Sequence, residues 1–279
     1  DVWNFFLKTE IPNACLPIGA IPTIAASGSE MSGSCVITNE DGWLKRGSTR
    51  SDLCRPKFTL MNPRLTYTLP EYQTESGCVD ILLHTMERYF SHDDDMTVTD
   101  AIAESILRTV KDSVFEVLKE PENYVHRAQI MWAGSLAHND LTGCGTTGDW
   151  ATHQLEHELS ALFDVAHGAG LAALWGSWAR YVYKENVTRF AQFAVNVMGV
   201  TNDFKSPEHT ALAGIEAMED FYRAIGMPVS ICELIGRQAT DEEIKLMADK
   251  CSSGGSTTTG NLKVLHRDDM KNIYRMANR

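Results

Sequence analysis

The pattern of hydrophobic and polar residues divides the chain into two parts. The first part contains short runs of small, β-branched and apolar residues, separated by Gly, Pro and Asn. Such runs predict short strands joined by turns. They occupy residues 14–24, 33–38 and 58–62. After Pro70 the apolar residues recur at helical spacing instead. We therefore expect a small β-containing domain at residues 1–65 and a mostly helical domain at residues 66–279.

Helical spacing predicts eight helices in the second part. The first follows the stripe formed by Ile81, Leu82, Met86 and Tyr89 and covers residues 80–90. The others are expected at residues 97–119, 122–140, 150–163, 169–185, 187–199, 207–225 and 241–251. Thr97, with Asp100 three residues later, and Pro121 are typical of helix starts.

The composition excludes several classes of protein. The net charge of −12 argues against nucleic acid or an anionic membrane as a partner. No run of 18 or more apolar residues occurs, so a membrane-spanning helix is not expected. The 7 cysteines are odd in number and include no C-x-x-C pair, which argues against a disulfide framework or a cysteine-rich zinc site. These features favour a cytoplasmic protein.

Two segments place carboxylate and imidazole groups at helical spacing. Asp80 and His84 are four residues apart, and so are His153 and His157. Residues at this spacing share one face of a helix. His167 follows ten residues after His157, at the start of a His-Gly-Ala-Gly sequence. One Asp and three His are a suitable ligand set for Zn²⁺ or Fe²⁺.

Spacing alone leaves a metal site open. Most D-x-x-x-H pairs are hydrogen-bonded pairs on a helix surface. The H-x-x-x-H segment also lacks the glutamate that directly follows the first His in metalloproteases. The remaining histidines are expected at the surface or in loops, without a role. They are His92, His126, His138, His209 and His266.

The segments around these residues resemble the iron-containing (group III) alcohol dehydrogenases, and within them the butanol dehydrogenase branch. The resemblance runs along almost the whole chain. Its most specific segments are Gly77-Cys-Val-Asp-Ile-Leu-Leu-His-Thr-Met-Glu-Arg-Tyr-Phe90, Leu118-Lys-Glu-Pro-Glu-Asn-Tyr124 and Asp149-Trp-Ala-Thr-His-Gln-Leu-Glu-His-Glu-Leu159. It implies a dehydroquinate synthase-like fold, in which the remnant of an amino-terminal α/β dinucleotide-binding domain precedes a large all-α metal-binding domain.

The resemblance also implies roles for individual residues. Asp80, His84, His153 and His167 match the metal ligands of the family. His157 matches the histidine beside the nicotinamide, which relays a proton or orients the ring. The residues that match positions around the dinucleotide are Thr23, Ser27, Ser32, Lys45 and Leu65.

Residues 23–30 match the cofactor loop T-x-x-G-T-G-S-E, except that Ala26 replaces Gly and Ser27 replaces Thr. A turn rich in Gly and hydroxyl groups after an apolar strand offers donors to phosphate or ribose. An ordinary turn at a strand end is the alternative. Lys45 belongs to a basic stretch that is typical of a solvated loop. Its other members are Arg46, Arg50, Arg55 and Lys57.

We expect a metal-dependent alcohol dehydrogenase or aldehyde reductase. It would transfer hydride between NADH or NADPH and a small, butanol-like primary alcohol or aldehyde. A glycerol or polyol dehydrogenase is one alternative, although such relatives more often lack a His at the position of His84. A metal-binding fragment without activity is another, because no Gly-Gly-Gly-Ser turn precedes Thr23. On this ground about 100 amino-terminal residues of the family pattern are expected to be missing. Relatives are commonly dimers, which leaves a homodimer open.

Overall fold

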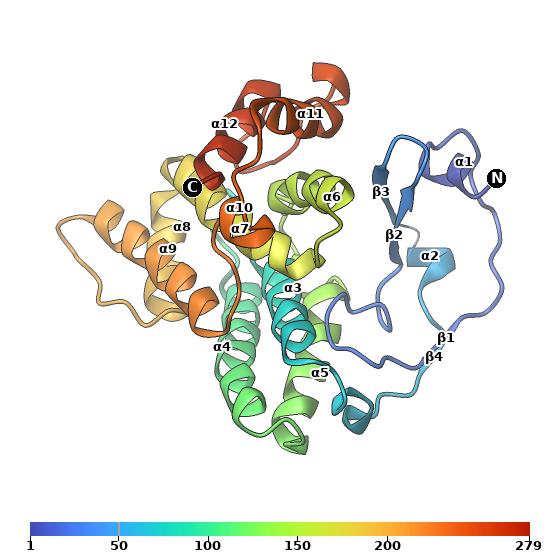
Figure 1. Cartoon of the computed structure of the whole chain (residues 1–279). Helices are drawn as coiled ribbons and strands as arrows, with labels where there is room; N and C mark the ends of the chain where they lie inside the picture. Colours follow the sequence, from blue (N-terminus) through green and yellow to red (C-terminus); the bar gives the residue numbers. More distant parts are fainter. Residues whose placement is uncertain (50) are drawn as a thin grey trace.

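The computed structural model describes residues 1–49 and 51–279. Helices from the second part of the chain pack around α3 (Glu71–Tyr89), and the residues before η1 (Pro63–Thr66) lie to one side of them (Figure 1). The amino terminus is at the outer edge of this side, whereas the carboxyl terminus lies among the helices. Arg50, a member of the basic stretch, lies outside the described residues.

The amino-terminal part contains two small sheets of two strands each. In one, β1 (Gly19–Ala20) and β4 (Phe58–Thr59) are parallel. In the other, β2 (Ser34–Asn39) and β3 (Leu44–Thr49) form an antiparallel hairpin. The short helices α1 (Trp3–Phe6) and α2 (Ser51–Cys54) complete this part. Each of the three predicted strand regions therefore contains a strand, although two of these strands have only 2 residues.

The first two members of the basic stretch do not lie in the solvated loop that its composition predicts, whereas Arg55 and Lys57 lie outside helices and strands. Lys45 and Arg46 belong to β3, because β2 contributes β-branched residues with which this segment pairs. The hairpin is also tied to the helices. Arg46 Nη1 donates to Glu158 Oε1 over 2.8 Å, and Lys250 Nζ donates to the carbonyl oxygen of Gly42 over 2.8 Å. These contacts hold β3 against α6 and α11.

The second part consists of helices. The longer ones are α3, α4 (Thr97–Lys119), α5 (Tyr124–His138), α6 (Ala151–Phe163), α7 (His167–Val182), α8 (Val187–Asn196), α9 (Pro207–Ala224), α11 (Asp241–Cys251) and α12 (Arg267–Ala277). The shorter ones are α10 (Ile231–Ile235), η1, η2 (Leu141–Gly143), η3 (Tyr183–Glu185) and η4 (Ser253–Gly255). The described helices include none with the length and apolar composition that crossing a bilayer requires.

The eight predicted helices are confirmed, but several of their ends differ. Pro121 does not begin α5. Instead the side chain of Asn123 caps this helix by accepting the backbone N–H of His126. Thr97 is the first residue of α4, yet the cap position is occupied by Met96, which makes no side-chain cap. α7 begins at His167, two residues before the predicted start, so this histidine lies on a helix.

The periodicity does not predict α10 and α12. With 5 residues, α10 is too short to show a period. α12 carries a readable signal, because its buried residues are spaced at three and four positions. They are Met270, Ile273, Tyr274 and Ala277.

The helix α3 lies at the centre of the helical part, against α4, α5 and α7. Every residue from Thr74 to Tyr89 is buried, so its polar side chains have to find partners inside the protein. α7 approaches α3 closely at Gly168, where a Cβ atom would lie 1.9 Å from the carbonyl oxygen of Ser76. The Gly-Ala-Gly sequence after His167 therefore permits this contact.

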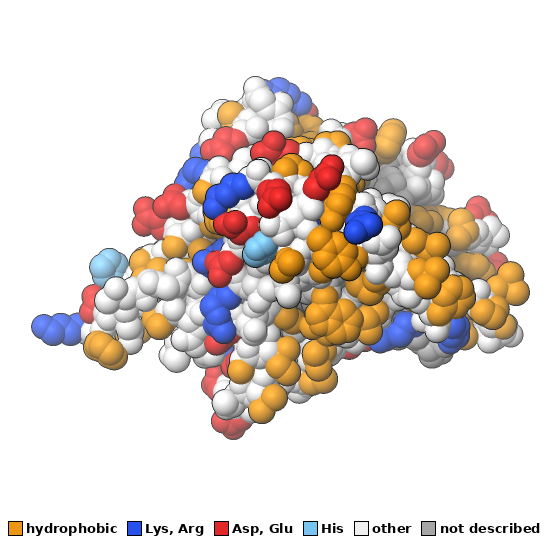
Figure 2. Space-filling view, turned by 90° about the horizontal axis from the view of Figure 1, so that it is seen from below, with side chains coloured by type: hydrophobic (Ala, Val, Ile, Leu, Met, Phe, Trp, Pro, Cys, Tyr) orange, Lys and Arg blue, Asp and Glu red, His pale blue; other side chains and the backbone are white. Residues whose placement is uncertain are grey.

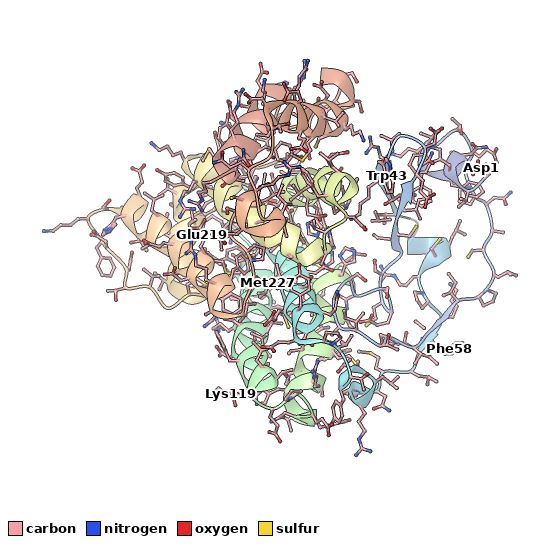
Figure 3. All side chains as sticks on the ribbon, viewed as in Figure 1. Asp1, Trp43, Phe58, Lys119, Glu219 and Met227 are labelled. Atoms are coloured by element: carbon pink, nitrogen blue, oxygen red, sulfur yellow. The ribbon has the colours of Figure 1, made fainter. Side chains whose placement is uncertain are left out.

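A group of aromatic side chains packs at the end of α3, where the rings of Phe90 and Phe190 stack with centroids 4.3 Å apart. One buried carboxylate, Glu219 of α9, lies within the helical part and is marked in Figure 3. It accepts two hydrogen bonds of 2.7 Å from Arg180 and one of 2.6 Å from Arg279. Gly176 leaves room for it, since a Cβ there would lie 2.1 Å from Glu219 Oε1.

Candidate functional site

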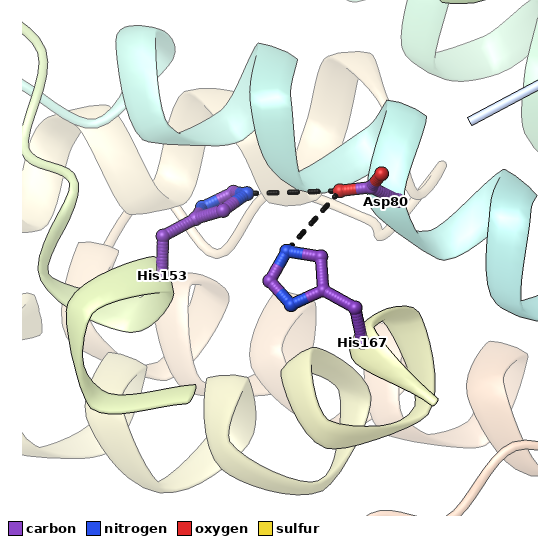
Figure 4. Close-up of side chains that lie close together, drawn as sticks. All are labelled: Asp80, His153 and His167. Atoms are coloured by element: carbon purple, nitrogen blue, oxygen red, sulfur yellow. Dashed lines mark ion pairs between the residues drawn. The ribbon is translucent and has the colours of Figure 1, made fainter. Parts of the chain in front are cut away.

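Three helices bring the predicted ligand residues together. Asp80 and His84 lie one turn apart on α3, His153 lies on α6, and His167 is the first residue of α7. Figure 4 shows His153 and His167 directed toward the carboxylate of Asp80. The sequence separates the two ends of this set by 87 residues, from Asp80 to His167, so the packing of α6 and α7 on α3 creates the cluster.

The imidazoles converge on a single oxygen atom. Asp80 Oδ1 lies 3.6 Å from His84 Nε2, 3.7 Å from His153 Nε2 and 3.7 Å from His167 Nε2. Asp80, His153 and His167 also offer ligand atoms that all lie within 4.8 Å of one another. Asp80, His84 and His153 are buried, whereas 29% of the His167 side chain is exposed. Solvent therefore reaches the cluster most easily on the side of the His167 ring.

Three buried atoms of the cluster lack hydrogen-bond partners within the described residues, namely Asp80 Oδ1, His153 Nε2 and His84 Nδ1. Buried polar atoms without partners are uncommon in folded proteins. Asp80 Oδ1 and His153 Nε2 face each other across the cluster at 3.7 Å, which is the arrangement expected of ligand atoms for a cation.

Two glutamates accept hydrogen bonds from the Nδ1 atoms of His153 and His167. Glu87 Oε1 accepts hydrogen bonds from His153 Nδ1 over 3.0 Å and from the backbone nitrogen of His153 over 2.9 Å. Glu156 accepts a hydrogen bond from His167 Nδ1. Gly170 leaves room for Glu156, because a Cβ there would lie 2.6 Å from Glu156 Oε1. Each carboxylate thereby leaves the Nε2 atom of its histidine free to face Asp80.

Charge and burial set the pKa values in the cluster. Burial opposes ionisation of Asp80, but His84, His153 and His167 outweigh it and hold the pKa of this carboxyl well below its usual range. Burial keeps the pKa of His84 well below its usual value. Burial also lowers the pKa of His153, but the carboxylates of Asp80 and Glu87 outweigh that effect and raise it to about 9. An ionised carboxylate among imidazoles is an environment that suits a cation.

His157 lies one turn beyond His153 on α6, with its ring 5.7 Å from that of His167 between centroids. It is buried, and burial together with His167 and Lys45 keeps the pKa of His157 well below its usual value. The imidazole is therefore neutral at physiological pH and has a free lone pair that can accept a proton.

Glu156, His157 and His167 form a second group whose ligand atoms lie within 4.8 Å of one another. The ammonium group of Lys45 lies 3.8 Å from Glu156 Oε2. A positive charge at this distance disfavours a second cation. We therefore interpret Glu156 as the residue that orients His167.

The predicted cofactor residues lie at three places. Thr23 and Ser27 are exposed on the segment between β1 and β2, and Ser32 is buried on the same segment, where its Oγ accepts the backbone N–H of Ser34. Lys45 on β3 donates from Nζ to Ser160 Oγ over 2.7 Å. Leu65 lies on η1 and is 41% exposed.

The segment 23–30 is seated on α3 and α5. Gly77 allows this contact, because a Cβ there would lie 2.4 Å from the carbonyl oxygen of Ala25. Gly28 adopts a φ of +59°, and a Cβ on it would lie 2.7 Å from the carbonyl oxygen of Gly134. The hydroxyl group of Ser135 donates to Glu30 at the end of the segment. The loop that resembles the cofactor loop therefore borders α5 and α3, the helix that carries Asp80 and His84.

The expectation that His138 lies at the surface or in a loop is wrong, because it is the half-buried last residue of α5. Its ring lies against His84, with centroids 4.0 Å apart, and 5.9 Å from Trp150. Nδ1 of His138 lies 3.3 Å from Nη2 of Arg88. Burial and the charge of Arg88 lower the pKa of His138 to about 4. Its position at the end of α5 carries no motif, so the sequence gives no signal for this contact.

Glu87, Glu156 and Arg88 are also absent from the predicted set. Glu87 follows His84 by three residues, and Glu156 directly precedes His157. Their closeness to the predicted ligands is a signal that sequence reasoning can use, because histidine ligands usually bond to a carboxylate or carbonyl group.

Family models match both parts of the chain. The model described as "Fe-containing alcohol dehydrogenase family, C-terminal" matches residues 74–278. The model described as "Iron-containing alcohol dehydrogenase" matches residues 1–63.

Two curated relatives illustrate the similarity. Probable NADH-dependent butanol dehydrogenase 1 of Bacillus subtilis is 37% identical over 277 residues. NADPH-dependent aldehyde reductase YqhD of Escherichia coli is 34% identical over 286 residues. Each alignment covers 99% of this chain and 70% of the relative.

The fold is also similar to the crystal structure of NADH-dependent butanol dehydrogenase A from Thermotoga maritima. The TM-score is 0.93 at 33% identity, and the match covers 100% of this chain and 70% of that one. The family models, the relatives and this fold agree, and the chain belongs to the iron-containing alcohol dehydrogenase family.

Proposed function

We propose that this protein is a metal-dependent, NAD(P)-dependent alcohol dehydrogenase that interconverts small primary alcohols and aldehydes of about the size of butanol. The observation that carries the proposal is the convergence of three histidine Nε2 atoms on Asp80 Oδ1, at 3.6 to 3.7 Å. The similarity to butanol dehydrogenases and an aldehyde reductase supports the reaction and the size of the substrate.

The residues present fit a divalent ion. A tetrahedral ion with ligand bonds of about 2.1 Å separates its ligand atoms by about 3.4 Å, close to the separations from Asp80 Oδ1. We assign Asp80, His84, His153 and His167 as the residues that would hold Fe²⁺ or Zn²⁺. The donor set of three nitrogens and one oxygen suits either ion. When bound, such an ion supplies Lewis acidity that polarises a carbonyl group or lowers the pKa of an alcohol.

The chain's own groups would position and protonate the substrate. The exposed side of His167 gives a small alcohol access to the cluster. His157 lies beside His167 and is held neutral, so we assign it the role of accepting the hydroxyl proton during oxidation and returning it during reduction. Burial, together with His167 and Lys45, keeps the pKa of His157 low, so the imidazole is unprotonated before the substrate binds.

We assign the nucleotide to the surface that borders segment 23–30. Exposed hydroxyl groups of Thr23 and Ser27 are available there as hydrogen-bond donors. Ser32, Lys45 and Leu65 complete the proposed set. The relatives are named for NADH as well as NADPH, so both are proposed as hydride carriers and both belong in the test.

The assay is reduction of butanal by NADH or NADPH, with protein loaded with Fe²⁺ or Zn²⁺. We expect turnover by the native chain, and we expect Asp80→Ala and His167→Ala to lose both metal content and activity. Elemental analysis measures metal content independently of activity. Unchanged metal content in both variants would contradict the ligand assignment.

Two further measurements distinguish this proposal from a metal-binding fragment and from a polyol dehydrogenase. Metal binding without a change in nicotinamide fluorescence on titration with NADH and NADPH would favour a metal-binding fragment without activity. Faster oxidation of glycerol than of butanol would favour a polyol dehydrogenase.

We propose that the protein is cytoplasmic and forms a homodimer through its amino-terminal part. Six cysteines carry free thiols, as expected in a reducing compartment. They are Cys15, Cys35, Cys78, Cys144, Cys232 and Cys251.

The proposed dimer interface lies in the amino-terminal part. Phe58 and Leu60 are 62% and 60% exposed, at a short parallel pair of strands, and Figure 2 shows broad apolar areas on one face of the molecule. Exposed strand edges favour pairing with another chain. Light scattering coupled to size exclusion tests this, and we expect Phe58→Asp to yield monomers.

A further inference from the structure

The three imidazoles that face Asp80 are held in different ways. Glu87 holds His153 and Glu156 holds His167, in both cases through Nδ1. Nδ1 of His84 is buried, and it has no hydrogen-bond partner among the residues that the structure describes. Something other than a hydrogen bond to this nitrogen must therefore set the orientation of the His84 ring.

The ring of His84 is enclosed by other rings. On one side it stacks on His153, with centroids 4.8 Å apart and an interplanar angle of 18°. A second imidazole, that of His138, lies closer, with centroids 4.0 Å apart and an angle of 30°. Trp150 lies 6.2 Å away at 54°. His138 is thus the nearest ring to His84.

His138 is itself fixed in place by Arg88. Nη2 of Arg88 lies 3.3 Å from His138 Nδ1, and its Nη1 donates to the carbonyl oxygens of His84 over 2.7 Å and of Ala137 over 3.1 Å. The guanidinium carbon lies 4.6 Å above the Trp150 ring. Because a guanidinium only donates hydrogen bonds, His138 Nδ1 accepts, and the imidazole is neutral with its proton on Nε2.

The loop at residues 23–30 confines His138 from the other direction. A Cβ atom on Gly28 would lie 2.9 Å from His138 Cβ, so the Gly28 backbone lies close to the His138 side chain. One turn earlier on α5, Ser135 donates to Glu30 at the end of the loop. The last turn of α5 is therefore fixed on the loop side as well as on the Arg88 side.

We infer that His138 is a positioning residue that holds the His84 ring by direct contact between the two rings, in place of the carboxylates that hold His153 and His167. This inference rests on the proposed metal site. The inference predicts that the last position of α5 needs a side chain with a flat, neutral ring. It also predicts that Arg88 keeps this ring in place.

The test uses Co²⁺ as the metal, because its visible absorption bands report coordination number and geometry. We compare the native chain with His138→Ala, which removes the ring, and His138→Phe, which keeps a flat neutral ring. The matched control is His126→Ala, since His126 lies on the same helix at its other end and contacts Ser113. We expect His138→Ala to bind Co²⁺ about 10-fold to 100-fold more weakly with shifted bands. His138→Phe should lose less affinity than His138→Ala, because it keeps a flat ring against His84 although it loses the contact with Arg88, and His126→Ala should keep the native spectrum.

Either of two results would overturn the inference: a native spectrum and affinity in His138→Ala, or a loss in His138→Phe as large as in His138→Ala. Should His138→Ala not fold, as judged by circular dichroism, His138→Leu replaces it as a variant that fills the space without a flat ring. Asp80→Asn identifies failure of the proposed function itself. If that variant binds Co²⁺ as the native chain does, the metal site is wrong. If it loses Co²⁺ while His138→Ala does not, only the role of His138 is wrong.

Discussion

One oxygen atom of Glu87 accepts hydrogen bonds from both the ring and the backbone of His153, at 3.0 Å and 2.9 Å. This double contact fixes both the orientation of the ring and its distance from α3. We predict that Glu87→Gln lowers the affinity for Zn²⁺ about 10-fold to 100-fold, because a carboxamide is a weaker acceptor for the His153 ring. Competition with a chromophoric chelator measures this affinity. Glu116→Gln is the control, since Glu116 is 45% exposed on α4. Equal affinities in the two variants would count against the role of Glu87.

Gly170→Ala tests whether Glu156 must keep its position to orient His167. The added methyl group would lie 2.6 Å from Glu156 Oε1 and 2.9 Å from Glu156 Cγ, and Glu156 is fully buried. We predict a loss of unfolding free energy of about 1–3 kcal/mol and weaker Zn²⁺ binding. Urea denaturation and chelator competition measure the two effects. Gly47→Ala on β3 is the control, because its nearest contact is an ordinary 3.7 Å to Val36. Similar behaviour of the two variants would show that the space beside Glu156 is not needed.

A substitution of Lys45 tests the proposed nucleotide site without changing any of the proposed metal ligands. The ammonium group of Lys45 contacts Ser160, and the Lys45 side chain is 18% exposed. We predict that Lys45→Met weakens NADH or NADPH binding about 10-fold, as expected for loss of one charge-assisted hydrogen bond. Titration of nicotinamide fluorescence gives the dissociation constant, with metal content measured on the same sample. Lys57→Met removes an exposed charge from the same basic stretch. If it weakens binding equally, general electrostatic attraction explains the effect.

The buried carboxylate of Glu219 predicts a pH dependence of stability. Burial opposes its ionisation, but Arg180 and Arg279 outweigh burial and hold the pKa of Glu219 below its usual value. A depressed pKa means that the stabilisation is present above the unfolded pKa of about 4.3 and is lost as the pH falls through the folded pKa. We predict that Glu219→Gln lowers the unfolding free energy at pH 7 by about 2 kcal/mol. The difference from the native chain should shrink below about pH 4.

Urea unfolding curves at several pH values between 7 and 3 measure this difference. Glu216→Gln, an exposed position on the same helix, serves as the control and should differ little from the native chain. A loss of stability in Glu219→Gln that is constant with pH would contradict the assignment to the ion pair.

The helical part of the fold could be predicted well because its helices are long and periodic. α4 and α11 have the predicted bounds. Helix ends were less predictable, since the cap at Asn123 depends on a single side-chain hydrogen bond. The strand β3 was not predictable from its own residues. It forms because β2 pairs with it and because Arg46 and Lys45 find partners on α6.

The residues that form the cluster at Asp80 could be predicted, but not all of the contacts between them and their neighbours. Spacing placed Asp80 and His84 on one helix face, and the family resemblance added the other ligands. The contact of His138 with His84 could not be predicted, because it depends on how α5 packs on α3 and on the position of Arg88. Likewise, only the packing shows that Gly170 makes room for Glu156.

The unequal exposure of the ligand residues has a kinetic consequence. Asp80, His84 and His153 lie on or against a helix whose residues from Thr74 onward are buried, while the His167 ring is partly open to solvent. We expect an ion that enters or leaves the proposed site to pass His167, at the first turn of α7. Its exchange would then depend on movement of that turn, which Glu156 restrains through His167. The half-life of the bound ion would therefore respond to changes in the local stability of one helix end.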